Sequence, residues 1–153
     1  MKTILVSSCL LGLKTRYDAT DNYSPRVVDF LERHDYTPIP VCPEQLAGLP
    51  TPRAKCWFSF GDGLSTLNGN GRICNESGQD VTEQFIHGAQ ETLKIAGLTN
   101  CDKAILQQRS PSCGSCSIYL NEHLTEGMGI TAAFLKKNGL TIYGDDNLPV
   151  ENS

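Results

Sequence analysis

The chain has 153 residues, which is enough for one domain whose core needs no disulfide to hold it together. Hydrophobic residues make up 39% and charged residues 20%, as in ordinary folded proteins, and the formal net charge is −4. A general binder of nucleic acid or of an anionic membrane is usually basic. The charge therefore favours neither kind of partner.

The N-terminal stretch MKTILVSSCLL begins like a secretory signal, with a lysine before an apolar run. Ser7, Ser8 and Cys9 interrupt the run, and no A-x-A-like cleavage site follows. No segment approaches the roughly 20 apolar residues that a membrane-spanning helix needs. We therefore expect a cytoplasmic protein, in which the seven cysteines remain thiols unless a metal binds them, since an odd number fits a disulfide framework poorly.

The first part of the chain predicts a strand, a helix and a second strand. Residues 3–7 (TILVS) form a short β-prone apolar run that is typical of a buried strand. Ser24 followed by Pro25 indicates a helix N-terminus, with serine as the cap and proline at the first helical position. Residues 36–41 (YTPIPV) predict a second strand, whose two prolines favour the edge of a sheet.

The middle of the chain shows less regular patterning. Residues 42–63 are rich in proline and glycine and have no sustained period, so we expect a long functional loop there. The sequence NGNG at 68–71 indicates a tight turn, and residues 72–74 are expected to form a minor strand.

Helices and strands alternate again in the last part of the chain. Residues 80–96 predict a helix that begins at DVTE and stops at Gly97. Residues 103–106 predict a strand, residues 129–138 a helix ended by a glycine, and residues 140–143 a last strand.

Strands that alternate with helices predict an α/β fold. We expect a single domain with a mostly parallel sheet and helices on both faces, in a Rossmann-like three-layer arrangement. The domain is expected to span residues 1–145, and residues 146–153 to form a mobile C-terminal tail.

Three cysteines follow three of the predicted strands. Cys9, Cys42 and Cys113 each lie in a loop just past the carboxyl end of a strand. In open α/β sheets this edge is where ligands bind, so the three thiols are expected to meet in space. Three thiolates suit a soft metal centre, and an iron–sulfur cluster held by only three cysteines leaves one iron free for substrate. Three buried structural thiols are the alternative interpretation.

The pair Cys113 and Cys116 has other possible interpretations. A C-x-x-C sequence can be half of a zinc site, but the chain has no second C-x-x-C or H-x-H pair, and its histidines are His34, His87 and His123. A thioredoxin-like redox pair usually lies at a helix start after the first strand, unlike this SPSCGSC turn. The sequence leaves two interpretations of Cys116 open: a thiol with no role in the site, or an accessory thiol.

Three separated motifs in this order make the chain resemble the thiouracil desulfidase family. They are SSCLLG and RYD within residues 7–18, PVCPEQLAGLPTPR at 40–53 and RSPSCGS at 109–115. Further similarity runs through NGRICNESGQDVTEQFIHGAQ and GMGITAAFLKKNGL, so that the resemblance covers nearly the whole chain.

The resemblance implies a metal-binding enzyme with an oxygen-sensitive [4Fe-4S] cluster, which removes sulfur from a thiolated pyrimidine such as 2-thiouracil without net redox change. Transferred onto this sequence, the cluster ligands would be Cys9, Cys42 and Cys113. Glu44 would be the acid/base residue and Ser110 would contact the substrate. Such an enzyme also implies iron–sulfur delivery machinery as a partner.

The sequence departs from the family pattern in two places. AKCWFSFGDG follows PTPR where a proline-rich stretch with a glutamate is usual, and YLNEHLTEG after the C-x-x-C turn looks shortened. Both departures lie where substrate could be held. The acidic charge favours a small-molecule substrate over a nucleic acid.

The residues by themselves also leave two other functional classes open. One is an iron–sulfur binding or electron-carrying module, and the other is a zinc-thiolate hydrolase. Glu44 could instead order the loop after Cys42, while Cys74 and Cys101 are expected to be structural thiols.

Overall fold

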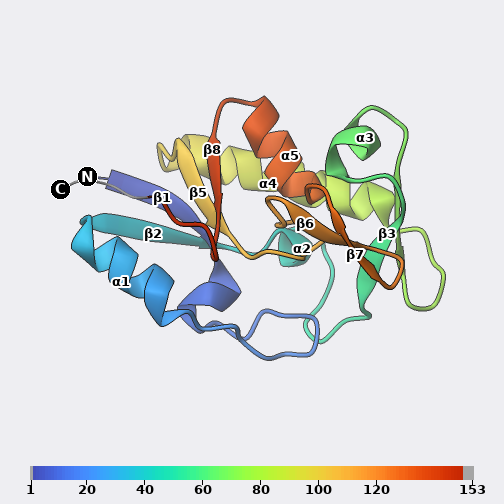
Figure 1. Cartoon of the computed structure of the whole chain (residues 1–153), viewed down its shortest axis with the longest axis horizontal. Helices are drawn as coiled ribbons and strands as arrows, with labels where there is room; N and C mark the ends of the chain where they lie inside the picture. The colour runs from blue at the N-terminus through green and yellow to red at the C-terminus, as the bar shows by residue number, and fades with distance from the viewer. Residues whose placement is uncertain (1, 150–153) are drawn as a thin grey trace.

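A computed structural model describes residues 2–149 of the chain, which form two β-sheets joined by helices (Figure 1). The larger sheet consists of β1 (Lys2–Ser7), β2 (Tyr36–Val41), β5 (Lys103–Leu106) and β8 (Thr141–Gly144). These strands lie in the order β2-β1-β5-β8, and every neighbouring pair is parallel. The predicted mostly parallel sheet is therefore confirmed, with the proline-containing strand β2 at its edge.

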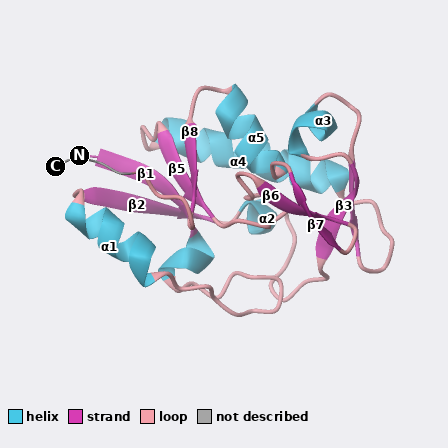
Figure 2. Ribbon diagram, viewed as in Figure 1, coloured by secondary structure: helices cyan, strands magenta, loops and turns pink. Residues whose placement is uncertain are grey.

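Helices cover both faces of the larger sheet (Figure 2). Ile4 and Val6 of β1 pack on one face against α1 (Pro25–Arg33), whereas Leu5 points to the other face. That second face packs against α4 (Thr82–Leu98) and α5 (Ile130–Lys137). The alternation along β1 follows from the two-residue period of a strand and confirms the three-layer arrangement.

The N-terminus of α1 forms as its sequence predicts. The Ser24 side chain accepts a hydrogen bond from the Val27 backbone N–H at 3.2 Å, and Pro25 occupies the first helical position. The serine satisfies a backbone donor that has no partner within the helix, and proline loses nothing there because its N–H would have been unpaired.

The smaller sheet corrects the prediction of one long loop over residues 42–63. That segment contains helix α2 (Pro43–Leu46), strand β3 (Cys56–Phe60) and the start of helix α3 (Gly63–Leu67). β3 pairs with β4 (Arg72–Asn75), the expected minor strand, and with β6 (Ser117–Leu120). β6 continues into a hairpin with β7 (His123–Glu126) that no sequence pattern indicated.

The smaller sheet has the order β4-β3-β6-β7 and packs on the same two helices as the larger sheet. Phe58, Ile73 and Ile118 from its strands contact Phe85 of α4 and Ile130 of α5. These strands are short, and although β6 pairs with the adjacent β7, the pairing of β3 with β6 joins segments that are far apart in the chain. Their stability comes from this packing and from pairing between strands.

The end of α4 also differs from the prediction. The helix continues through Gly97 to Leu98, and Asn100 adopts the left-handed conformation with φ +57°. The Cys101 N–H then donates to the Ala96 carbonyl at 2.9 Å, which closes the helix with the hydrogen bond of a Schellman motif. Asparagine therefore ends this helix in place of the predicted glycine, because its short polar side chain tolerates the left-handed region.

The remaining predicted elements lie within a residue or so of their expected bounds. Gly139, with φ +95°, follows α5 as expected, and β8 begins one residue later than predicted. In the proposed tail, Leu148 packs against the cluster formed by β1 and α1, while residues 150–153 lie outside the described residues. The domain boundary at residue 145 and the mobility of the tail stay predictions.

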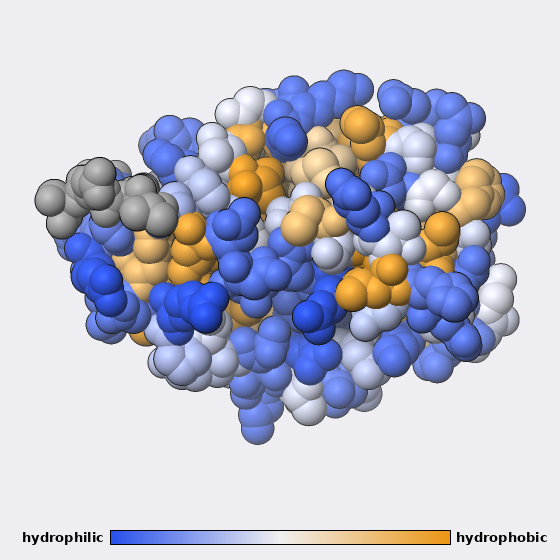
Figure 3. Space-filling view, viewed as in Figure 1, coloured by the Kyte–Doolittle hydropathy of each residue, from blue (hydrophilic) through white to orange (hydrophobic). Residues whose placement is uncertain are grey.

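The packing leaves mainly polar side chains outside. Figure 3 shows hydrophilic residues over most of the face in view, with apolar residues in separate patches. Among residues 2–149, every helix is too short or too polar to cross a lipid bilayer.

Candidate active site

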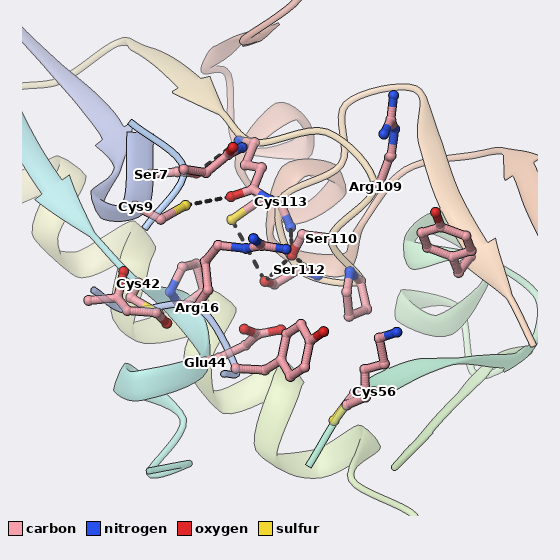
Figure 4. A pocket seen from close by; sticks show the side chains of 18 of the residues that line it. Ser7, Cys9, Arg16, Cys42, Glu44, Cys56, Arg109, Ser110, Ser112 and Cys113 are labelled. Carbon is pink, nitrogen blue, oxygen red and sulfur yellow. Dashed lines mark hydrogen bonds between the residues drawn. The ribbon is translucent and has the colours of Figure 1, made fainter. Parts of the chain in front are cut away.

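A cavity of about 820 Å³ opens at the carboxyl ends of β1, β2 and β5. Because these strands are parallel neighbours, the residues that follow them reach the same edge of the sheet. Cys9, Cys42 and Cys113 all line this cavity (Figure 4). β3 and the segment 119–122 contribute to its lining from the smaller sheet.

Cys9 lies in a short 3-10 helix, η1 (Ser8–Leu11), directly after β1. Its side chain is buried, and its thiol donates a hydrogen bond to Gln107 Oε1 at 2.5 Å. Gln107 immediately follows β5, and its backbone N–H donates to the Ser7 hydroxyl at 3.0 Å. The two adjacent strand ends are thus tied together beside the first thiol.

Cys42 occupies the N-cap position of α2, directly after β2. This helix packs closely on α4, where a Cβ added to Gly88 would lie 2.2 Å from the Pro43 carbonyl oxygen. Glycine is therefore required at this position for α2 to hold Cys42 and Glu44 at the cavity wall.

Cys113 lies in the turn that follows β5, and Ser110 orders this turn. The Ser110 hydroxyl accepts hydrogen bonds from the backbone N–H groups of Ser112 at 3.2 Å and Cys113 at 3.1 Å. The Ser112 hydroxyl in turn donates to the Cys113 sulfur at 3.7 Å. The sequence had suggested a substrate contact for Ser110, and the residue does line the cavity, but its hydroxyl already has these backbone partners.

Replacing Ser110 with alanine is expected to lower the free energy of unfolding by about 1 kcal/mol, because two backbone donors lose their acceptor. Any loss of activity should be smaller than that caused by removing the proposed base, Glu44. Thermal unfolding and iron content, measured together with the rate, test this expectation. Ser110→Thr keeps the hydroxyl and is the matched control. Equal destabilisation in both variants would mean that the hydroxyl does not order the turn.

Gln108 is a buried residue of the site that no sequence pattern indicated. Its Oε1 atom accepts hydrogen bonds from the backbone N–H groups of Ser115, Cys116 and Ser117, and its Nε2 donates to the Cys116 sulfur at 3.2 Å. Cys116 is exposed and is not among the described residues that line the cavity. The sequence around Gln108 does not indicate this role, because the role depends on how the turn at residues 115–117 folds back onto the glutamine side chain.

The surroundings of the three thiols keep them protonated when no cation is bound. Burial, together with the nearby Cys113 and Cys42 sulfurs, raises the pKa of Cys9 to about 12. Burial also raises the pKa of Cys42, and raises that of Cys113 to about 12 although hydroxyls of Ser7 and Ser112 oppose the shift. A metal centre would therefore displace protons as it binds these sulfurs as thiolates.

The donor set fits an iron–sulfur cluster. Three soft thiol donors from three separate loops line one cavity, whose volume of about 820 Å³ has room for a group of several atoms. No three His, Cys, Asp or Glu side chains in the part of the chain that the structure describes converge closely enough to bind a single metal ion.

Glu44 lies in the first turn of α2 and forms an ion pair with Arg53 at 2.5 Å. The Glu44 and Arg53 side chains are only 16% and 5% exposed. Arg53 also donates hydrogen bonds to the Thr15 carbonyl at 2.9 Å and to the Thr51 hydroxyl at 2.9 Å. The guanidinium therefore both neutralises the carboxylate and fixes the loops around it.

Cys56 is a fourth thiol that lines the cavity. It donates to the Ala54 carbonyl at 3.5 Å, and burial and the charge of Glu44 raise its pKa to about 12. In Figure 4 it lies beyond Glu44 from Cys9 and Cys113. Its position therefore separates it from the other three cavity thiols.

The RYD segment forms part of the cavity wall through Arg16 and Tyr17. The Tyr17 ring lies 5.8 Å from the Arg16 guanidinium carbon and 5.6 Å from the Lys55 Nζ. Asp18 is exposed and accepts a hydrogen bond from the Thr20 hydroxyl at 2.5 Å. Asp18 therefore orders the first loop, whereas Arg16 and Lys55 add positive charge to the cavity.

Comparisons with known proteins agree with this arrangement. A model of the 2-thiouracil desulfurase family matches residues 4–147. The uncharacterized protein YbbK of Bacillus subtilis is 38% identical over 148 residues, which cover 95% of this chain and 97% of YbbK. The solved structure of the [4Fe-4S]-dependent thiouracil desulfidase TudS is similar with a TM-score of 0.80 and 33% identity, over 95% of this chain and 92% of TudS. The chain therefore belongs to the 2-thiouracil desulfurase family.

Proposed function

We propose that this protein is a [4Fe-4S]-dependent desulfidase that hydrolyses the C=S bond of a thiolated pyrimidine such as 2-thiouracil. Water supplies the oxygen, and the products are uracil, hydrosulfide and a proton, so that no electrons are exchanged. The observation that carries the proposal is the meeting of three thiols in one cavity at the ends of three adjacent parallel strands. Membership of the family and the likeness to TudS support it.

Cys9, Cys42 and Cys113 are the proposed cluster ligands, because they are the cavity thiols that follow β1, β2 and β5. Such a cluster, held by three cysteines, supplies an open iron that acts as a Lewis acid toward sulfur. The turn ordered by Ser110 keeps Cys113 in place, and Ser110 also faces the space where the pyrimidine would bind.

Glu44 is the proposed general base. It lines the same cavity as the three thiols, and its charge raises the pKa of Cys42 and Cys113, which indicates that the carboxylate lies near both sulfurs. Arg53 fixes the carboxylate so that one oxygen remains available to accept a proton from the attacking water. The ion pair thereby positions the base.

The proposed reaction makes the protein a hydrolase, and its free thiols suit a reducing compartment such as the cytoplasm. Iron–sulfur delivery machinery is the proposed source of the cluster. The family match favours desulfidation over an electron-carrying module or a zinc-thiolate hydrolase.

Anaerobic purification, metal and sulfide analysis, and a multiple-turnover assay with 2-thiouracil test the proposal. We expect iron and sulfide in the protein, and one hydrosulfide for each uracil formed, with no reductant added. A protein that contains zinc alone, or a strict requirement for stoichiometric electrons, would contradict it.

A further inference from the structure

We propose that Arg16 is a further catalytic residue, which binds the sulfur atom as it leaves the pyrimidine as hydrosulfide. The inference rests on the proposed desulfidase function. Arg16 lines the cavity, and Figure 4 shows its side chain extending into the space between Cys42 and Cys113, on the same side of the site as Glu44.

Among residues 2–149 the guanidinium of Arg16 has no anionic partner, and its recorded neighbour is the Tyr17 ring at 5.8 Å. No carboxylate of this part of the chain lies within ion-pair distance, and no hydrogen bond from the side chain is formed. The nearby Asp18 is fully exposed and bonded to Thr20. Arg53, by contrast, uses its donors on Glu44 and the surrounding loop.

The backbone on both sides of Arg16 is fixed. Arg53 donates from its guanidinium to the Thr15 carbonyl at 2.9 Å and from its backbone N–H to the Tyr17 carbonyl at 2.8 Å. The Arg16 N–H also donates to the Thr20 carbonyl at 3.1 Å. Arg53, the residue paired with Glu44, therefore holds the Arg16 backbone at the cavity wall through both of its neighbours.

The positive charge of Arg16 lies where negative charge would develop on the sulfur atom of the substrate. The guanidinium shares the cavity with the three thiols Cys9, Cys42 and Cys113, where the sulfur of the substrate would also lie. In the proposed reaction the water oxygen forms a bond to the ring carbon, Glu44 takes one water proton, and the π electron pair of the C=S bond moves to sulfur. The remaining C–S bond then breaks with its electron pair going to sulfur, which takes the second water proton and leaves as hydrosulfide, while the oxygen forms the C=O bond of uracil. The sulfur is nearly neutral in the substrate and anionic when it leaves. A guanidinium therefore binds the transition state and hydrosulfide more strongly than the substrate.

The test is an anaerobic titration of the cluster-containing protein with sodium sulfide, without substrate, followed by visible absorption and normalised to iron content. We expect Arg16→Gln to weaken hydrosulfide binding by about tenfold or more, and Arg16→Lys, which keeps the charge, to weaken it less. Arg109→Gln is the matched control, because Arg109 also lines the cavity but in Figure 4 extends away from the cysteines.

In steady-state kinetics with 2-thiouracil, we expect Arg16→Gln to lower kcat by about 10²-fold and to change KM little. This is the pattern expected of a group that stabilises charge only in the transition state. Hydrosulfide affinity within twofold of the parent protein, or a rise in KM alone, would overturn the proposal. The sulfide titration needs no turnover. A parent protein that fails to convert 2-thiouracil would therefore count against the proposed function, while the titration still decides the role of Arg16.

Discussion

Replacing Cys9, Cys42 or Cys113 with serine is expected to abolish desulfidation of 2-thiouracil and to prevent stable binding of the cluster. Serine is nearly the same size as cysteine but is a poor ligand for iron in such clusters, so each change removes one of three ligands. The measurements are iron and sulfide content and visible absorption after anaerobic reconstitution. All three variants should lose the cluster, because each thiol comes from a different loop and none can replace another.

Cys116→Ser and Cys56→Ser are the matched controls for this experiment. Cys116 is exposed and held by Gln108, and Cys56 lies beyond Glu44, so both variants should retain the cluster. Loss of the cluster in Cys116→Ser together with its retention in Cys9→Ser would show that the ligand set is wrong. Thermal unfolding of the cluster-free proteins separates ligand loss from misfolding.

Glu44→Gln is expected to lower kcat by roughly 10²–10⁴, the usual contribution of a positioned general base, while the cluster absorption survives. The same change leaves the Arg53 guanidinium, only 5% exposed, without its carboxylate. Removing one partner of a buried pair costs about 3–5 kcal/mol, so the variant should also unfold at a lower temperature.

The double variant Glu44→Gln with Arg53→Gln distinguishes the two effects. Removing both charges should restore part of the lost stability without restoring the rate, because the base is still absent. Glu122→Gln removes another carboxylate that lines the cavity and should leave the rate unchanged. Nearly full activity in Glu44→Gln would mean that the carboxylate only orders the loop after Cys42.

Only those parts of the site that follow from the order of the strands and from short motifs could be predicted from the sequence. The three cysteines could be placed because each follows a strand, and carboxyl ends of parallel strands meet at one edge. The partners of Glu44 and Cys116 could not be identified in this way. Arg53 reaches Glu44 across a loop with no regular pattern, and Gln108 acts through a turn that lies several residues further along the chain.

The sequence by itself determined the elements whose signals are local. The Ser24 cap, the glycine after α5 and the apolar run of β1 each depend on the preferences of a few adjacent residues. Tertiary structure alone decided the smaller sheet, because β3, β6 and β7 are stabilised by pairing and by packing on α4 and α5. It also decided that Arg16 reaches the cavity of the thiols. Each of these outcomes depends on contacts between residues far apart in the chain, which no local preference encodes.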